Sequence, residues 1–406
     1  MTARAWKAAA IFVAILAAAD LAGAQIAKRV MPQWFSDMPG SNPRAYSPIY
    51  HHGFRPLADT MLRFGPLLYP IRTNSLALID GTARVVDPGA KGCRVLFVGD
   101  SFTEGLGNAW ADSFVGRLAA LWAERGVEVL NAAAVSYSPT VHYRKVKHLI
   151  EGRGLRADAV LLFLDLSDVA DEWEQYDFDA AGNVTARVRD WLIRRQDGNP
   201  TSWDRFWFLA QDNSIVLHAA RELWLRVARP WQGAIFDRPR PPDPPSRPAP
   251  EPPLGRIEPP PILLGPEAVA RRLPGRSDDH RARWTIEAGL YDKFGRYGLM
   301  KAAAMMDRLV LLLRERGISL TVLVYPWTEL IVAGDRDSVQ VRFWRQWART
   351  RDAGFVDLFP LFLDAGEAKE VVDQYVIPRD FHWNAAGHAL VADAVDRAID
   401  PRRFCK

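Results

Sequence analysis

The sequence predicts an α/β layer fold with a five-stranded parallel sheet and one insertion after the third strand. Three observations support this prediction: short apolar segments, helical patterns between them, and a break in that order near residue 177. Short apolar runs are typical of strands buried on both faces of a sheet. Strands that alternate with helices pair in parallel through right-handed crossovers. The expected strands are Val95–Val98, Val127–Leu130, Ala159–Leu164, Ile318–Tyr325 and Phe355–Leu358.

Helical patterns connect these strands. The first carries Phe114, Leu118 and Trp122 at helical spacing and stops at Gly126, because glycine commonly terminates helices. Further helices are expected over residues 141–150, 297–316, 342–351 and 385–399. The sequence contains no internal repeat.

Residues 1–24 have the features of a signal peptide or an N-terminal membrane anchor. Arg4 and Lys7 precede an apolar run from Ala8 to Ala19, and a signal peptidase could cut after Ala22-Gly23-Ala24. The run is shorter than the roughly 20 apolar residues of a comfortable span, and Asp20 would be costly deep in a bilayer. A buried alanine-rich helix is the alternative. Either exported form predicts an extracytoplasmic protein: periplasmic, secreted, or anchored by its N-terminus.

The rest of the chain divides into four parts. Residues 25–91 have many turn signals and few periodic stretches, which predicts an irregular region. The α/β pattern fills residues 92–176 and resumes over 283–406. The insertion, residues 177–282, has a Trp-rich amphipathic stretch and then 12 of the 29 prolines between Pro239 and Pro261. Such a tract is incompatible with helix or central strand, so we expect a spacer or loop.

Charge and cysteine content exclude several classes of protein. The chain has 52 Lys+Arg against 48 Asp+Glu, with both signs interspersed, so no basic field for nucleic acid is evident. Cys93 and Cys405 lack the spacing of a zinc site, and no metal or other cofactor is expected. The two could pair in an oxidising compartment, but the sequence leaves open whether they come within reach.

Two motifs carry candidate chemistry. GDSFTEG (Gly99–Gly105) follows the first strand, and RDFHWNAAGH (Arg379–His388) follows the fifth. In open parallel sheets, ligands bind beyond the carboxyl ends of the strands, so both motifs belong to one sheet edge. A serine nucleophile needs a base, and the base needs an orienting carboxylate. Ser101, His382 and Asp380 could supply these three groups, although GDSx alone also occurs as an ordinary turn.

The motifs resemble the first and last sequence blocks of the GDSL/SGNH hydrolase superfamily of serine esterases and acyltransferases. The resemblance covers about Cys93–Trp173 and Trp284–Ala398. It implies a three-layer α/β/α sandwich with a five-stranded parallel sheet. It also implies that Ser101 is the nucleophile, His382 the base and Asp380 its orienting partner, with the Ser101 N–H as one oxyanion donor.

Two other blocks depart from the family pattern. The second normally reads N-x-G, and Asn131-Ala132-Ala133 places Ala133 at the glycine. Its N–H suffices for an oxyanion contact if φ is negative, although plain packing is an equal alternative. The third block normally ends in Asn-Asp, with the Asn side chain donating to the oxyanion. Here Ser167 stands in its place, and its hydroxyl is a candidate oxyanion donor, while Asp168 is expected to brace the loop. Losing one oxyanion donor removes about 2.7–4 kcal/mol of transition-state stabilisation. Ser167 in place of asparagine is therefore expected to change the reaction rate more than the reaction type.

Trp383 and Trp327 are candidate substrate-binding residues. Trp383 follows the histidine where simple esterases of the family often have proline, and the Asp-x-His-Trp sequence is similar to that of alginate-type polysaccharide O-acetyltransferases. This similarity implies a carbohydrate-facing site in which an aromatic ring stacks on a sugar. Trp327 follows the fourth strand at the same edge, where it either lines the pocket or covers the sheet.

Structural roles are expected for several other polar residues. His388, on the last helix, is interpreted as a buried structural histidine. His51 and His52 are expected in a solvated loop. Asp171 and Glu172 are expected at a solvated helix start, where carboxylates suit the helix dipole.

The function that follows is an exported serine esterase that hydrolyses an oxygen ester on a small molecule or polysaccharide, with acetyl groups on a carbohydrate as one candidate. The first alternative is a polysaccharide O-acyltransferase with the same triad, because water exclusion, which sequence does not report, decides between hydrolysis and transfer. The second is a non-catalytic carbohydrate-binding or assembly protein, which Ala133 and Ser167 favour.

Overall fold

The computed structural model describes residues 3–30, 43–64, 67–186, 210, 213–220, 223, 280–378 and 380–405. Contacts divide the chain into two units. The first comprises residues 1–42, 60–68 and 194–248, and the second comprises residues 43–59, 69–193 and 249–406. All candidate site residues belong to the second unit. The proline tract, Pro239–Pro261, lies outside the described residues.

Helix α1 (Ala3–Val30) is mostly apolar, with charged residues near its two ends and at Asp20. Its large side chains are exposed, including Ile11, Phe12 and Ile15 at 60–62%. Among the described residues, it is the one helix that is long and apolar enough to cross a membrane. It lies near the N-terminus, where a signal sequence or a membrane anchor would lie. The helix runs well beyond the predicted apolar run, and its 28 residues reach about 42 Å. Exposed apolar surface of this kind suits a lipid environment better than water.

The central sheet contains eight strands and is mixed, which corrects the prediction of a five-stranded parallel sheet. The strand order is β12-β11-β8-β6-β7-β5-β4-β3. The five predicted strands are present and pair in parallel. Their bounds are β6 Cys93–Val98, β7 Val127–Asn131, β8 Ala159–Leu164, β11 Ser319–Val324 and β12 Gly354–Asp357.

Strands from the N-terminal region extend this sheet, so the prediction that residues 25–91 are irregular was wrong. The region contains β1 (Arg44–Ser47), β2 (His51–Phe54), β3 (Asp59–Phe64), β4 (Leu67–Thr73) and β5 (Ile79–Asp80). Strand β5 pairs antiparallel with β7 and with β4, and β1 pairs with β2. The longest of them, β4, has the sequence LLYPIRT, which contains a proline and two adjacent leucines and so lacks the strict alternation of apolar and polar residues that indicates a half-buried strand. A hairpin of β9 (Tyr176–Phe178) and β10 (Val184–Ala186) follows the third parallel strand.

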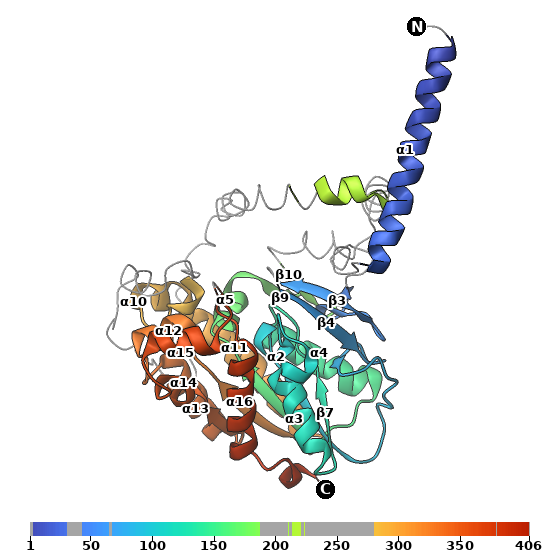
Figure 1. The fold of residues 1–406 in the computed structure, drawn as a ribbon. Coiled ribbons are helices and arrows are strands. Elements are labelled where there is room, and N and C mark those ends of the chain that lie inside the picture. The colour runs from blue at the N-terminus through green and yellow to red at the C-terminus, as the bar shows by residue number, and fades with distance from the viewer. Residues whose placement is uncertain are drawn as a thin grey trace. The chain divides into compact units, whose positions relative to one another are not determined.

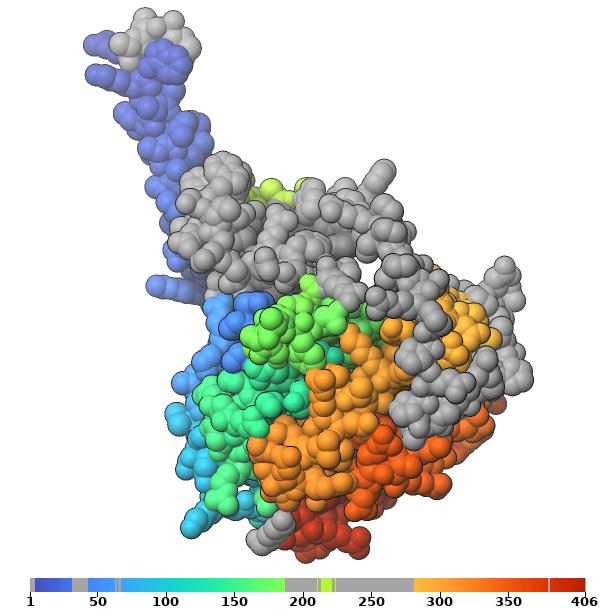
Figure 2. Space-filling view, turned by 180° about the vertical axis from the view of Figure 1, so that it is seen from behind, coloured from blue at the N-terminus to red at the C-terminus, as the bar shows by residue number. Residues whose placement is uncertain are grey.

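Helices cover both faces of the sheet. Figure 1 shows α3 (Phe114–Ala123) and α16 (Ala385–Ala398) side by side in front of it. Seen from behind, α11 (Arg296–Arg314) lies against α4 (Pro139–Lys147) and α5 (Ser167–Glu174) (Figure 2). Within the described residues, the other helices of the second unit are α2 (Ser101–Glu104), α10 (Ala288–Leu290), α12 (Thr328–Ala333), α13 (Val339–Thr350), α14 (Phe359–Leu363) and α15 (Ala368–Tyr375). Short 3₁₀ or π turns occur at Trp110–Asp112, His148–Gly152, His280–Ala282, Tyr291–Gly295 and Pro401–Phe404.

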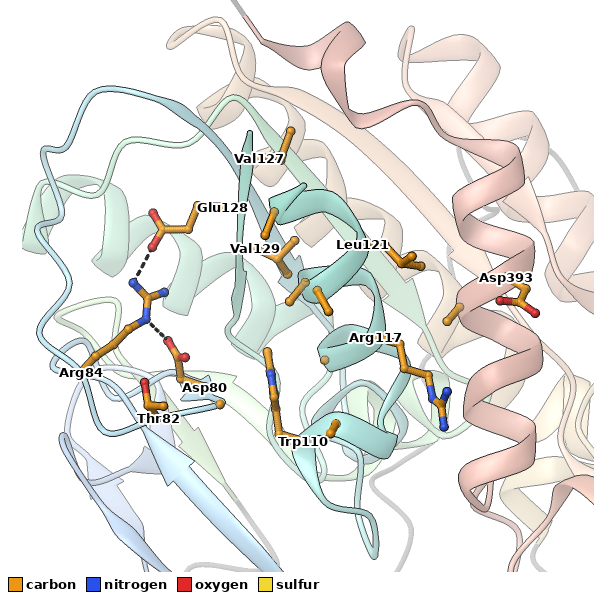
Figure 3. A pocket seen from close by; sticks show the side chains of 17 residues that line it. Asp80, Thr82, Arg84, Trp110, Arg117, Leu121, Val127, Glu128, Val129 and Asp393 are labelled. Atoms are coloured by element: carbon orange, nitrogen blue, oxygen red, sulfur yellow. Dashed lines mark hydrogen bonds and ion pairs between the residues drawn. The ribbon is translucent and has the colours of Figure 1, made fainter. Parts of the chain in front are cut away.

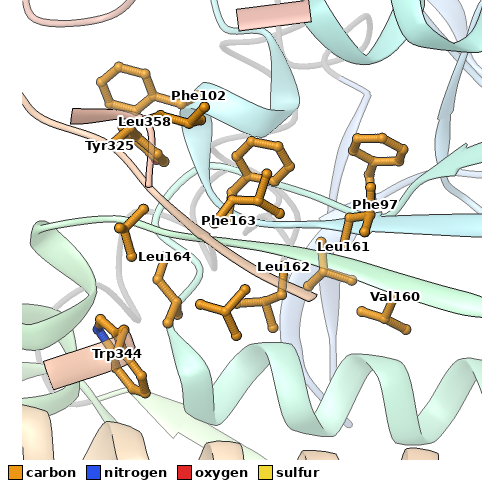
Figure 4. Packing of buried hydrophobic residues seen from close by; sticks show 14 of the residues in the cluster. Phe97, Phe102, Val160, Leu161, Leu162, Phe163, Leu164, Tyr325, Trp344 and Leu358 are labelled. Carbon is orange, nitrogen blue, oxygen red and sulfur yellow. The ribbon is translucent and has the colours of Figure 1, made fainter. Parts of the chain in front are cut away.

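The core is centred on β8. All six of its residues are fully buried, as the unbroken apolar run AVLLFL predicts for a central parallel strand. Phe163 packs against Phe97, with 6.1 Å between ring centroids (Figure 4). It also packs against Phe114 at 4.7 Å. Burial of each such side chain stabilises the fold by about 1.5–3 kcal/mol. This packing fixes the strand ends from which the site loops project.

A disulfide joins the beginning of β6 to the C-terminus. Cys93 and Cys405 are bonded, and their Cα atoms lie 5.0 Å apart. The pairing that the sequence left open is therefore made in the structure. It closes the amino edge of the sheet, opposite the edge that bears the two motifs.

Two pairs of polar residues expected in solvent are buried instead. His51 and His52 lie in β2, where Nε2 of His52 is 2.7 Å from the carbonyl oxygen of Val135. Asp171 and Glu172 are buried because α5 packs against α4 and α11. The Glu172 carboxylate accepts hydrogen bonds from the N–H of Thr140 (2.6 Å) and from the hydroxyls of Ser138 and Thr140. It therefore satisfies the amino end of a neighbouring helix rather than its own.

Candidate active site

The turn after β6 presents Ser101 at the carboxyl edge of the sheet. Gly99 is packed so closely that a Cβ there would lie 2.2 Å from the hydroxyl oxygen of Thr103, so no side chain fits. Asp100 then caps α2 by accepting the N–H of Phe102 at 3.0 Å. The strand–turn–helix geometry therefore places the serine at the first position of the helix, beyond the carboxyl end of β6.

The turn before α16 presents His382 at the same edge. Asp380 Oδ1 accepts the N–H groups of Phe381 and His382, each at 2.8 Å, which is the local hydrogen-bonding habit of aspartate in turns. The N–H of Ile377 donates to the carbonyl oxygen of His382 at 2.9 Å. Asn384 then caps α16 through the N–H groups that follow it. The imidazole is thus oriented mainly by its own segment of chain.

The structure brings Ser101, His382 and Asp380 together in one hydrogen-bonded series. Nε2 of His382 lies 2.8 Å from Oγ of Ser101, and Nδ1 lies 2.5 Å from Oδ1 of Asp380. A neutral imidazole that donates Nδ1–H to the carboxylate keeps Nε2 as an acceptor for the serine hydroxyl. This is the arrangement that proton removal from a serine requires.

The charge on Asp380 suits this role. Burial alone would raise the pKa of its carboxyl, but hydrogen bonds from the His382 side chain and from the backbone of residues 381 and 382 outweigh burial, so the pKa lies below its ordinary value. The carboxylate is therefore ionised at neutral pH. An ionised carboxylate at this position is able to stabilise a positive charge on the imidazole.

A second, buried carboxylate lies next to the serine. Asp100 Oδ2 is 3.3 Å from the Ser101 hydroxyl, and its Oδ1 accepts the hydroxyl of Tyr325 at 3.1 Å. Tyr325 also lies 3.0 Å from Asp165, which accepts the indole N–H of Trp327 at 2.7 Å. Burial and the charge of Asp165 hold the pKa of Asp100 well above its usual range. The sequence motifs do not reveal this network, although Asp100 stands in the first motif and Tyr325 follows the fourth strand.

The predicted oxyanion donors are placed unequally. The N–H of Ser101, at the first position of α2, makes no hydrogen bond outside the helix among the described residues. Ala133 does not have a positive φ, but its N–H already donates to Oδ1 of Asn131 at 3.0 Å. Asn131 also donates from Nδ2 to the carbonyl oxygen of Thr103 at 2.8 Å. This amide therefore links the loop after β7 to the helix of the nucleophile.

Ser167 begins α5 and is buried. Its N–H donates to Asp165 Oδ1 at 2.5 Å. Among the described residues no hydrogen bond joins its hydroxyl to Ser101 or His382. Asp168 accepts the N–H of Asp165 at 3.0 Å, so this loop is braced by its own aspartates.

Trp383 and Trp327 do not face the site, which corrects their assignment as substrate-binding residues. Each is 1% exposed. Trp383 packs against Tyr325 at 4.8 Å between ring centroids, because its side chain points into the core beneath the turn. Trp327 stacks on Phe381 at 4.1 Å with 11° between the rings. Phe381 is half-buried and lies 4.4 Å from the imidazole of His382, so it is a partly exposed aromatic residue that borders the triad.

His388, on α16, belongs to the core. His388 is buried and accepts the N–H of Phe114 at 3.2 Å, with burial lowering its pKa to about 3. It is therefore a neutral structural histidine. Within the described ranges, no three His, Cys, Asp or Glu side chains are grouped so as to hold a metal ion.

A hollow of about 690 Å³ lies on another part of the second unit. Figure 3 shows Trp110 within it, between the ion pairs of Arg84 with Asp80 and Glu128 and the side chain of Arg117. None of Ser101, His382 and Asp380 lines this hollow. The chemistry therefore indicates the triad, and not this hollow, as the candidate active site.

No protein-family model and no curated protein matches this sequence. Solved structures with similar backbones include LAE5, an α/β hydrolase from the metagenome of Lake Arreo, Spain, at 15% identity over 77% of this chain and 97% of that chain, with a TM-score of 0.34. The acetyl xylan esterase AlAXEase is 13% identical over 76% of this chain and 100% of that chain, with a TM-score of 0.38. A catalytic mutant of Axe2, an acetylxylan esterase from Geobacillus stearothermophilus, is 12% identical over 77% and 95%, with a TM-score of 0.35. At such low similarity, the activity of this chain has to be inferred from its own residues.

Proposed function

We propose that this protein is a serine esterase of the GDSL/SGNH type that hydrolyses an oxygen ester. One observation carries the proposal: Ser101 Oγ lies 2.8 Å from His382 Nε2, while Nδ1 of the same ring lies 2.5 Å from Asp380. Nucleophile, base and orienting carboxylate are thus in hydrogen-bond contact before any substrate binds. These residues come from segments 281 positions apart.

The proposed reaction has two stages. Ser101 Oγ attacks the carbonyl carbon of the ester as His382 Nε2 takes the hydroxyl proton, and Asp380 stabilises the imidazolium. The tetrahedral intermediate collapses, the leaving alcohol takes the proton from Nε2, and the acyl group stays on Ser101. A water molecule then attacks the acyl carbon and gives a proton to Nε2. Collapse releases the carboxylic acid and returns that proton to Ser101.

The developing oxyanion needs preorganised donors. The Ser101 N–H is one, at the first position of α2. The Ala133 N–H would have to leave Asn131 Oδ1 in order to donate, and the third donor would be the Ser167 hydroxyl in place of the family's asparagine amide. We therefore propose a slower enzyme than one with both family donors in place, since each lost donor costs about 2.7–4 kcal/mol.

We place the catalytic unit outside the cytoplasm. Helix α1 has the length and composition of a signal sequence or membrane anchor. The Cys93–Cys405 disulfide is the kind of bond that persists in an oxidising compartment. These two features are independent of each other and support the same location.

Transfer of the acyl group to a sugar hydroxyl is the second candidate function. Ser101 and His382 are only 8% and 5% exposed, and this burial would limit the access of water to an acyl group on Ser101. Exclusion of water favours a bound acceptor over hydrolysis. An acetyl ester on a carbohydrate is the substrate that both functions share. The intact triad geometry argues against a binding protein without activity.

The test uses the full-length protein in mild detergent. A fluorophosphonate probe and p-nitrophenyl acetate are applied to wild type, to Ser101→Ala and to a matched control, Ser319→Ala, at the opposite edge of the sheet. Labelling and hydrolysis are expected in wild type and the control, with a loss of at least about 10³-fold in Ser101→Ala. Persistent labelling of Ser101→Ala would contradict the assignment of the nucleophile.

Adding a polysaccharide acceptor separates the two functions. Release of nitrophenol that does not depend on the acceptor, with free acetate as product, supports hydrolysis. Release that requires the acceptor, with acetate found on the polysaccharide, supports transfer. If folded wild-type protein neither releases nitrophenol nor is labelled by the probe, only the non-catalytic alternative remains.

A further inference from the structure

Glu104 ends the helix of the nucleophile and is buried away from the triad. Its side chain is 1% exposed and forms a two-pronged ion pair with Arg44 of β1, with 3.0 Å between Nη1 of Arg44 and Oε2. The same Oε2 accepts the N–H of Val135 at 2.7 Å. One carboxylate therefore connects three segments: α2, the β1–β2 hairpin and the loop after β7.

The loop after β7 is held on its other side by the same hairpin. The Val135 carbonyl oxygen is 2.7 Å from Nε2 of His52, and the hydroxyl of Tyr137 donates to the His52 carbonyl oxygen at 2.5 Å. Ser136, between them, has a φ of +60°, a strained value for a residue with a side chain. A strained turn persists only where its surroundings determine it, and the hairpin and Glu104 provide those contacts.

The geometry ties this clamp to the direction of the Ser101 hydroxyl. Helix α2 is a single turn, so Ser101 and Glu104 are its first and last residues. Fixing Glu104 fixes the rotation of that turn, and with it the direction in which Ser101 Oγ points. The loop carries the Ala133 N–H at its start, so the same contacts set the spacing between the nucleophile and a candidate oxyanion donor.

We propose that Glu104, oriented by Arg44, is a positioning residue that aligns the Ser101 hydroxyl with His382 and holds the loop after β7 at its working distance. This inference rests on the proposed function. It assigns the β1–β2 hairpin, which lies outside the family motifs, to the catalytic unit. The charge of Glu104 matters because a buried carboxylate holds both an arginine and a backbone N–H more strongly than a neutral amide does.

The test measures the rate at which a fluorophosphonate labels Ser101 in full-length protein, divided by the folded fraction from near-UV circular dichroism. Glu104→Gln keeps the size of the side chain and removes the charge. It is expected to slow labelling and kcat for p-nitrophenyl acetate by about 10- to 100-fold, because small displacements of a nucleophile have effects of this size. KM should stay within about twofold, since Glu104 does not touch the substrate.

Two further variants separate positioning from stability. Arg44→Gln combined with Glu104→Gln should label at the rate of Glu104→Gln alone, because Arg44 acts through Glu104. Arg316→Gln, which breaks an ion pair with Glu151 on another surface, is the matched control and should label at the wild-type rate. Arg44→Lys keeps the charge but loses the two-pronged geometry, so it should slow labelling to a smaller extent.

If Ser101 is labelled in wild type and folded Glu104→Gln is labelled at the same rate, the positioning role is overturned and the proposed function is not. If Glu104→Gln does not fold, an unchanged rate in Arg44→Lys overturns it instead. No labelling of Ser101 in wild type overturns the proposed function, and the positioning role with it.

Discussion

The two halves of the triad are held in different ways. His382 is oriented by its own turn, in which one oxygen of Asp380 receives two backbone N–H groups and the imidazole. Ser101 stands on a one-turn helix whose position depends on residues from elsewhere in the chain, including Arg44 and Asn131. A base in a self-contained turn can be recognised from a short motif. A nucleophile supported by distant segments is vulnerable to changes that no motif reveals.

The largest effect should come from the self-contained half. Asp380→Asn is expected to lower kcat/KM by about 10⁴-fold, or about 5.5 kcal/mol, because an amide cannot hold the imidazole with Nδ1 protonated and Nε2 free. Hydrolysis of p-nitrophenyl acetate measures the loss, and a melting curve checks the fold. A variant that keeps a tenth of wild-type activity would show that His382 does not depend on Asp380.

Removing the disulfide should act on the opposite edge of the sheet and spare both halves. The double variant Cys93→Ser/Cys405→Ser is expected to lose about 2–5 kcal/mol of unfolding free energy. Its fluorophosphonate labelling rate per folded molecule should stay at the wild-type value, because the bond lies at the amino end of β6. Urea unfolding with and without reductant measures the loss of unfolding free energy. Slower labelling in the folded variant would mean that the two ends of β6 are coupled.

In the part of the molecule that supports Ser101, Lys145 should make the free energy of unfolding depend on pH. This lysine is buried behind the loop after β7, donates to the hydroxyl of Tyr137 at 3.0 Å, and has its pKa lowered by burial to about 7. Between pH 7 and its ordinary pKa, the unfolded chain binds one more proton than the folded chain, so stability rises with pH. From pH 7 to 9 this contribution is about 2 kcal/mol. Lys145→Met should flatten the rise in urea midpoints, and an unchanged slope would show that another group causes it.

The smallest effect is expected at the helix that follows His382. Asn384 caps α16 by accepting the N–H groups of Ala386 (2.9 Å) and Gly387 (3.0 Å). Asn384→Ala should cost about 1 kcal/mol, whereas Asn384→Asp should retain most of the stability because aspartate is an equally good cap. Thermal melts of the two variants measure the difference. Equal melting temperatures would indicate that the cap contributes nothing here.

The sequence predicted the parts of the fold that follow from local pattern. The five parallel strands are short apolar runs, such as Ala159–Leu164, and each is found where the pattern placed it. The N-terminal strands were missed because pairs such as β5 with β7 involve only one or two residues on each strand. Their pairing depends on partners that sequence spacing does not identify.

The candidate site shows the same division. Ser101, Asp380 and His382 were identified by motif, and the structure brings them together. Trp383 was misassigned because an aromatic residue beside a histidine can point to either side of its turn, and here it enters the core. Glu104 is part of the first motif, but its ion-pair partner Arg44 lies 60 positions earlier in the chain. Long-range ion pairs leave no periodic signal.

The bond between Cys93 and Cys405 has a consequence for the intact chain. It joins a residue that precedes the insertion to one that follows it, across 312 positions. A protease that cleaves anywhere between residues 187 and 279 would therefore generate two polypeptides that stay covalently attached. Ser101 would belong to one fragment and His382 to the other. On a gel, such nicked protein would migrate as one band until a reducing agent separates the fragments.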